Sequence, residues 1–130
     1  MPMPPCAAAV LYAKDLSKIG NFYAQVAGLQ IIHEEPDHIV LESDAFQLVV
    51  VAIPGEHAAS IHITEPPQRR ENIAIKLAFP VASITATRQM AQLHGGEFNS
   101  PSREWLFQGA RVCDGQDPEG NVVQFRESVP

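Results

Sequence analysis

The sequence has little positive charge and no long hydrophobic run. Nine Lys and Arg residues stand against fifteen Asp and Glu residues, and the formal net charge of −6 leaves no basic surface to offset repulsion by the phosphates of a nucleic acid or an anionic membrane. The longest apolar runs, Cys6–Ala13 and Leu48–Pro54, are far shorter than the roughly 20 residues of a membrane-spanning helix. We therefore expect neither a nucleic-acid partner nor a membrane partner.

Cysteines are scarce as well, since Cys6 and Cys113 are the only two. They neither establish nor exclude a disulfide bridge, and Met1–Pro5 carries none of the basic residues that open a signal peptide. We therefore predict a cytoplasmic protein in which both thiols are reduced and buried. A Gly-rich phosphate loop and a G-x-S-x-G motif are also missing, which leaves nucleotide binding and serine hydrolysis without support.

What the sequence does contain is one order of elements that occurs twice. Apolar residues make up 45% of the chain and charged residues 18%, a balance typical of a single globular domain, here residues 1–130. In residues 6–54 the apolar periodicity predicts strand Ala7–Tyr12, a helix that Asp15 caps and Gly28 ends, and strands Leu29–Glu34, His38–Glu42 and Phe46–Ile53. A linker at 55–71 follows. In residues 72–127 the same periodicity predicts strand Asn72–Phe79, helix Val81–His94, and strands Glu97–Asn99, Ala110–Asp114 and Asn121–Glu127.

Each half therefore has the order βαβββ, which predicts an α+β fold of two tandem modules, 6–54 and 72–127. One such unit forms a curved mixed sheet with its helix on the convex side, and its concave side still needs cover. Two units set side by side, or exchanged between chains, close that side into a cup.

Two motifs carry a resemblance to a known family. A tight "DPEGN" turn at Asp117–Asn121 leads into a terminal strand with alternating side chains. The first helix shows the pattern Asp15-Leu16 … Phe22-Tyr23 … Gly28-Leu29. With the duplicated βαβββ order, these motifs resemble the glyoxalase/bleomycin resistance/extradiol dioxygenase superfamily, the vicinal oxygen chelate fold. The resemblance implies a small-molecule ligand and a homodimer in which a second chain completes each cup.

In the metal-using members of this superfamily, four cup-facing residues bind the metal. The matching positions here are Ala8, Gln47, Asn72 and Gln124. Position 124 is usually a glutamate in those members, and here it is an amide. Zinc, iron, nickel and manganese sites rely on His, Cys or carboxylate, and three amides with a methyl group supply no charge to compensate for desolvation of a dication. We therefore predict no cofactor and no metal at the family's site.

Because side chains alternate between the two faces of a strand, the sequence also suggests which residues face the cup and could bind a ligand. Gln47, Asn72 and Gln124 either form an amide cluster that hydrogen-bonds a small polar molecule, or satisfy one another and ordered water. Lys76 and Arg126 either attract an anionic ligand or, as we favour for residues near strand ends, extend into solvent. Tyr12 and Trp105 could stack on a planar ligand. Trp105 lies in a long loop at 99–108, where it either belongs to a lid over the cup or, equally, anchors the loop by packing on the sheet. The predicted ligand-binding residues are Tyr12, Gln47, Asn72, Lys76, Trp105 and Gln124.

Three functional hypotheses follow. The first is a metal-free protein that binds a small polar or anionic compound in the cup. The second is a lyase or dioxygenase of the same superfamily that uses a divalent metal at a non-standard site, for which His38, Glu42 and Glu97 are the residues to test. The third is an interaction or regulatory module whose cup is partly filled by its own side chains.

Overall fold

The computed structural model describes residues 5–130, so most of Met1–Pro5, where we found no signal-peptide character, lies outside the described residues. The first half contains β1 (Ala7–Ala13), α1 (Leu16–Gln25), β2 (Gln30–Glu35), β3 (His38–Glu42), β4 (Phe46–Ala52) and α2 (Gly55–Ala58). The second half contains β5 (Leu77–Pro80), α3 (Ile84–Leu93), β6 (Glu97–Phe98), the 3-10 turn η1 (Pro101–Arg103), β7 (Trp105–Phe107), β8 (Ala110–Gln116) and β9 (Val122–Ser128). No helix among residues 5–130 is long and apolar enough to cross a membrane.

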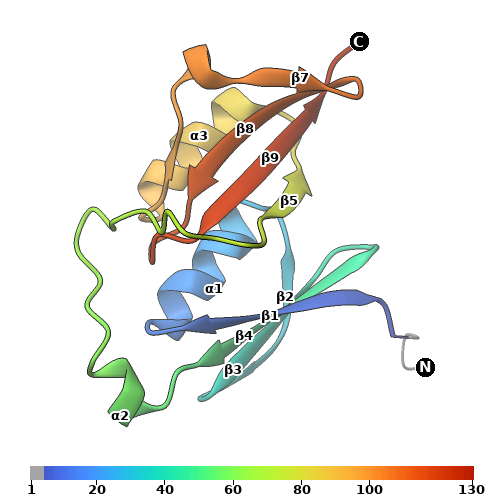
Figure 1. The fold of residues 1–130 in the computed structure, drawn as a ribbon. Helices are drawn as coiled ribbons and strands as arrows, with labels where there is room; N and C mark the ends of the chain where they lie inside the picture. Colours follow the sequence, from blue (N-terminus) through green and yellow to red (C-terminus); the bar gives the residue numbers. More distant parts are fainter. Residues whose placement is uncertain (1–4) are drawn as a thin grey trace.

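The strands form two mixed sheets, which confirms the predicted α+β fold (Figure 1). Sheet A has the order β1-β4-β3-β2, and β1 runs parallel to β4. Sheet B has the order β5-β9-β8-β6, with β7 paired to β8, and β5 runs parallel to β9. In both sheets the first strand lies at an edge, so β1 and β5 each have one side without a strand neighbour.

A capping residue begins each long helix. The Asp15 side chain accepts a hydrogen bond from the Lys18 backbone N–H, and Ser83 accepts one from Ala86 in the same way. These bonds satisfy amides that a helix leaves free at its first turn. Helix α1 covers one face of sheet A and lies between the two sheets, and α3 covers sheet B (Figure 1). The face of each sheet opposite its own helix is called its open face below.

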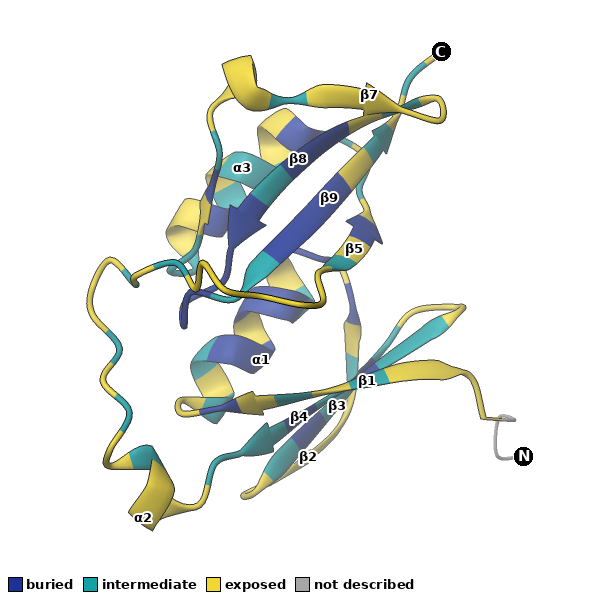
Figure 2. Ribbon diagram, in the orientation of Figure 1, coloured by how far each residue is buried: buried dark blue, intermediate teal, exposed yellow. Residues whose placement is uncertain are grey.

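An aromatic core joins the two halves. Tyr23 of α1 and Phe46 of β4 each lie 5.9 Å from the ring of Phe79 in β5, measured between ring centroids. Phe79 in turn contacts Phe125, which stacks on Phe98 at 4.5 Å. Figure 2 shows the buried residues concentrated on α1, β8 and β9. Burial of these rings favours a fixed relation between the modules.

The turn at Asp117–Asn121 fastens the second half to the first. Glu119 is buried, and its carboxylate accepts hydrogen bonds from the backbone N–H groups of Lys14 and Asp15 at 2.9 and 2.8 Å. Asp117 accepts from the Tyr23 hydroxyl at 2.8 Å. The turn that carries the family resemblance therefore also holds the start of α1 in place.

The first strand of the second half is shorter than predicted. It begins at Leu77, whereas we expected Asn72, and residues 72–76 are not in a strand. Leu77 pairs with Val123, and the partner strand β9 begins only at Val122, so the preceding residues have no strand to pair with. Ile73 and Ile75, which would pack beneath the helix if the strand began at Asn72, are instead 39% and 80% exposed.

The start of the second helix, the loop before β8 and the exposure of Cys6 also differ from the predictions. Pro80 ends β5, and the helix predicted from Val81 begins only after its cap Ser83. The segment predicted as a lid loop contains β7, which pairs with β8. The two thiols are free, and Cys113 is buried as predicted, but Cys6 is exposed because it precedes β1 at the start of the described chain.

Candidate functional site

The open face of sheet B carries a line of linked polar side chains. Asp114 of β8 and Gln124 of β9 are cross-strand partners, and Gln124 Nε2 donates to Asp114 Oδ1 at 3.2 Å. Gln124 Oε1 accepts from Arg126 Nε at 2.8 Å. Lys76 Nζ donates to Asp114 Oδ2 at 2.8 Å. Because Gln124 is only 7% exposed and uses both ends of its amide, its role is to hold Asp114 and Arg126 in place.

Two aromatic rings of β7 flank this line. The Lys76 ammonium lies 5.9 Å from the centroid of the Trp105 ring, and the Arg126 guanidinium carbon lies 5.4 Å from that of Phe107. Both distances fall within the range of cation–π attraction. Trp105 and Phe107 remain 41% and 46% exposed, so part of each ring is open to a ligand. We call Lys76, Trp105, Phe107, Asp114, Gln124 and Arg126 the sheet B ladder.

Sheet A carries a smaller counterpart. Gln47 of β4 and Glu42 of β3 are cross-strand partners, and Gln47 Nε2 donates to Glu42 Oε2 at 2.7 Å. Tyr12, on the same open face as Ala8, is 62% exposed. Ala8, Val10 and Tyr12, which alternate with the more buried residues of β1, therefore point away from the helix.

The structure thus divides the predicted ligand residues into groups. Lys76, Trp105 and Gln124 come together in the sheet B ladder, whereas Tyr12 and Gln47 lie on sheet A. Asn72 belongs to neither group, because it is exposed and precedes β5. The sequence argument missed Phe107 and Asp114, although their strand pairing places them on the same face as Gln124 and Arg126.

The positions that would hold the family's metal do not suit one. Ala8 pairs with Gln47, and Ala78 has the same relation to Gln124, so Ala78 takes the register position that we had given to Asn72. Both amides are already bonded to carboxylates, and two methyl groups complete the set. Neutral methyl and amide groups do not form a site for a transition metal.

The residues of the metal-enzyme hypothesis are also dispersed. His38 bonds to Asp37 at 2.8 Å, Glu42 bonds to Gln47, and Glu97 lies on β6 of the other sheet. The rings of His33 and His38 are neighbours at 5.6 Å, a pair that we did not predict, because residues 33–35 of β2 pair in regular antiparallel register with residues 38–40 of β3. Within residues 5–130, no group of three or more His, Cys, Asp and Glu side chains could hold a metal.

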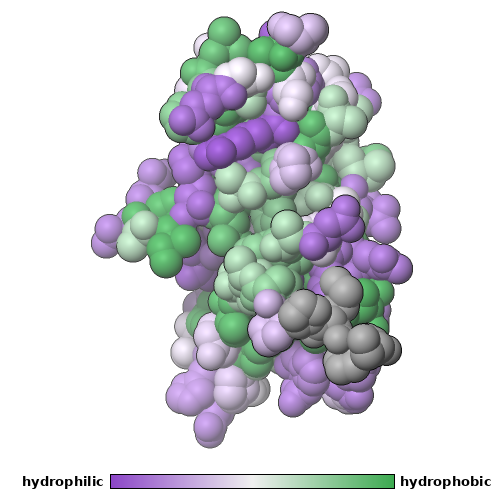
Figure 3. All heavy atoms as spheres, turned by 90° about the vertical axis from the view of Figure 1, so that its right-hand side faces the viewer, coloured by the Kyte–Doolittle hydropathy of each residue, from purple (hydrophilic) through white to green (hydrophobic). Residues whose placement is uncertain are grey.

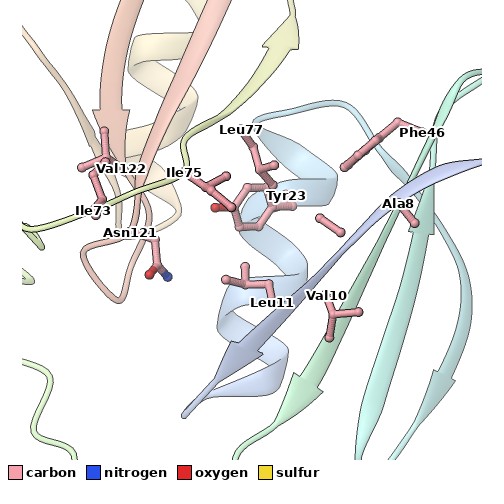
Figure 4. A pocket seen from close by; sticks show the side chains of 11 residues that line it. Ala8, Val10, Leu11, Tyr23, Phe46, Ile73, Ile75, Leu77, Asn121 and Val122 are labelled. Carbon is pink, nitrogen blue, oxygen red and sulfur yellow. The ribbon is translucent and has the colours of Figure 1, made fainter.

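An apolar cleft of about 510 Å³ lies between β1 and the segment before β5 (Figure 4). Tyr23 points toward its centre, with Leu11 on one side and Ile75 and Leu77 on another. The hydroxyl of Tyr23 is bonded to Asp117, so little polar chemistry is available there. In Figure 3 hydrophobic surface gathers across the middle of the side of the molecule that lies to the right in Figure 1.

Burial shapes the acid–base behaviour of three groups in the core. Desolvation raises the pKa of the Asp117 carboxyl above its usual value, although hydrogen bonds from Asn121 and Tyr23 act in the opposite direction. Desolvation, followed by the charge of Asp117, raises the pKa of the Tyr23 phenol. Burial also raises the pKa of the Cys113 thiol, which disfavours the nucleophilic thiolate.

Comparison with known proteins now places this geometry in a family. The sequence profile described as glyoxalase/bleomycin resistance protein/dioxygenase superfamily matches residues 6–125. The chain belongs to this superfamily. A comparison with curated proteins found no significant match.

Solved structures of the superfamily share the fold at low sequence identity. A family enzyme from Burkholderia phytofirmans is 18% identical, with a TM-score of 0.70 and coverage of 95% of this chain and 98% of that one. TnmS3, an antibiotic-binding protein from a Streptomyces species, is 18% identical, with a TM-score of 0.61 and 99% coverage of both chains. The fosfomycin resistance protein FosX from Listeria monocytogenes is 14% identical, with a TM-score of 0.65 and coverage of 98% and 96%.

Proposed function

We propose that this superfamily member binds a small polar or anionic compound on the open face of sheet B, without a metal. The observation that carries the proposal is the sheet B ladder, in which two cations and two half-exposed rings are fixed by the buried Gln124 and by Asp114. Such preorganised polar and aromatic groups are typical of ligand sites. TnmS3, which shares the fold, is an antibiotic-binding protein, and this supports a small-molecule ligand here.

The absence of suitable metal donors supports binding over metal-dependent catalysis. Ala8 and Ala78 have no donor atoms in their side chains, and Gln47 and Gln124 are engaged with carboxylates. Elemental analysis of the purified protein tests this part of the proposal. We expect far less than one equivalent of any transition metal per chain, and a stoichiometric metal that survives dialysis would overturn the metal-free proposal.

We further propose a homodimer that completes the cup. Because α1 lies between the sheets, the open face of sheet A points away from sheet B, and the two faces do not close on each other within one chain (Figure 1). Exposed apolar side chains lie on β1, where Val10 is 58% exposed, and in the segment just before β5, where Ile75 is 80% exposed. A second copy that covers these side chains would bury apolar surface and place Tyr12 and Gln47 of one chain opposite the sheet B ladder of the other.

A further inference from the structure

The sheet B ladder carries one positive charge that no carboxylate neutralises. Lys76 is paired with Asp114, and Gln124 is neutral. Arg126 donates Nε to Gln124, and among residues 5–130 no carboxylate forms an ion pair with its guanidinium. The two terminal nitrogens of Arg126 are therefore available to an anion.

The geometry of Arg126 favours a carboxylate. A guanidinium presents its two terminal N–H groups in a planar fork that matches the two oxygens of a carboxylate. Gln124 fixes the orientation of this fork by accepting from Nε. Asp114 and the acidic surface disfavour an anion with several charges, because only one cation of the ladder is uncompensated.

The rings beside Arg126 favour an aromatic ligand. Trp105 and Phe107 alternate with Leu106 along β7, so both rings lie on the open face, opposite Val112 and Ala110 of β8. Residues two apart on a strand are separated by about 7 Å, a distance that a bicyclic ring system spans. Half-exposed aromatic rings next to cations provide flat surface for stacking as well as attraction for negative charge.

We propose that the sheet B ladder binds an aromatic carboxylate, with the carboxylate on Arg126 and the ring against Phe107 and Trp105. This inference rests on the proposed function and specifies the chemical class of its ligand. Arg126 and the two rings contact the ligand, whereas Gln124 acts as a positioning residue. Lys76 and Asp114 contribute a neutral pair that borders the ring of Trp105.

Three probes separate the contributions of charge and ring: 2-naphthoate, its neutral analogue 2-naphthamide, and cyclohexanecarboxylate, which keeps the charge without aromaticity. Trp105 is the only tryptophan of the chain, so its indole N–H resonance reports directly from the site. We expect a saturable shift of this resonance with 2-naphthoate. The protein should bind 2-naphthamide at least about tenfold more weakly, because the amide loses one charge-assisted hydrogen-bonded pair with Arg126. Loss of stacking should weaken cyclohexanecarboxylate to a similar degree.

Arginine variants complete the test. Arg126→Gln should weaken 2-naphthoate by at least about tenfold and remove the preference over 2-naphthamide, whereas Arg103→Gln in the exposed turn η1 should change neither. Equal binding of the acid and the amide, or full affinity in Arg126→Gln, would overturn the aromatic-carboxylate assignment. The proposed function, metal-free binding of a small compound at the sheet B ladder, is tested separately. It is supported if a polar compound binds in a manner that depends on Gln124, and it is contradicted if none does.

Discussion

Gln124 donates a hydrogen bond to Asp114 across two strands of sheet B, and Gln47 makes the same bond to Glu42 in sheet A. Each glutamine lies on the strand of its sheet that comes last along the chain, and each is the direct cross-strand partner of its acceptor. The internal duplication therefore extends to side chains on the open faces. At both positions, which match metal-ligand positions of the superfamily, a neutral amide is bonded to a neighbouring carboxylate.

The buried contact between Tyr23 and Asp117 should be a major link between the halves. Tyr23→Phe removes a donor from a carboxylate that is 0% exposed, and we expect the free energy of unfolding to fall by about 2 kcal/mol. Urea denaturation measures the change. Tyr12→Phe is the control, because Tyr12 is 62% exposed, and it should change stability by less than about 0.5 kcal/mol. Equal effects of the two variants would show that the buried bond does not link the halves.

The raised pKa of Asp117 predicts a specific pH dependence. Since the folded pKa exceeds the unfolded value of about 3.9, folding binds a proton here, and the contribution to stability is fully present below pH 3.9 and is lost as pH rises through the folded pKa. We expect Asp117→Asn to be less stable than the natural protein, because Asn has one acceptor fewer. The deficit should be largest at low pH and shrink as pH rises.

Denaturation at several pH values above and below 3.9 tests this sign. Asp44→Asn, at an exposed turn position, should show no such trend. A deficit of Asp117→Asn that grows with rising pH would contradict the raised pKa, since it would mean that the folded protein favours the ionised carboxyl.

Gly120 is required by the turn that fastens the two halves. Its φ of +83° disfavours any side chain, and an added Cβ would collide with the backbone carbonyl oxygen of Gln68. We expect Gly120→Ala to lower the free energy of unfolding by about 2 kcal/mol or more. Gly55→Ala is a suitable control, because no atom lies within 4 Å of its added Cβ and its φ is not positive. Thermal or urea denaturation that ranks the two variants equally would argue against this role.

The proposed dimer can be tested in the segment just before β5. Ile75→Asp places a charge on a side chain that is 80% exposed, so it should leave the monomer fold intact and break a dimer that covers this segment. Light scattering should give twice the 14.2 kDa chain mass for the natural protein and the single-chain mass for Ile75→Asp. Leu93→Asp is the matched control, since Leu93 is 77% exposed on α3, and it should remain dimeric. A natural protein that is monomeric at high concentration would contradict the proposal.

Most of the fold could be predicted from the sequence because the signals for its helices, strands and turns are local. The cap at Asp15, the alternation of β1 and the turn before β9 all depend on neighbouring residues, and each is present in the structure. The assignment of Asn72 failed because the length of β5 depends on where its partner β9 begins, which is a property of pairing between distant segments.

The site was accessible to sequence reasoning only in part. Gln124 could be placed on the open face by alternation, and its neighbour Asp114 follows only from the register of β8 and β9. Phe107 was missed because β7 has three residues, too few for a recognisable alternating pattern. Arg126 was expected to extend into solvent, and it is exposed, but its contacts with Gln124 and Phe107 could not be read from the sequence.

The most direct test of the central claim follows the Trp105 indole resonance while EDTA-treated protein is titrated with a panel of small carboxylic acids, amides and amino acids. We expect at least one compound to give a saturable shift that EDTA does not abolish. Gln124→Leu should weaken that binding by about tenfold or more, because it frees Asp114 and Arg126, whereas Gln92→Leu on the surface of α3 should not. Binding that requires added metal, or that is unchanged in Gln124→Leu, would contradict metal-free recognition by the sheet B ladder.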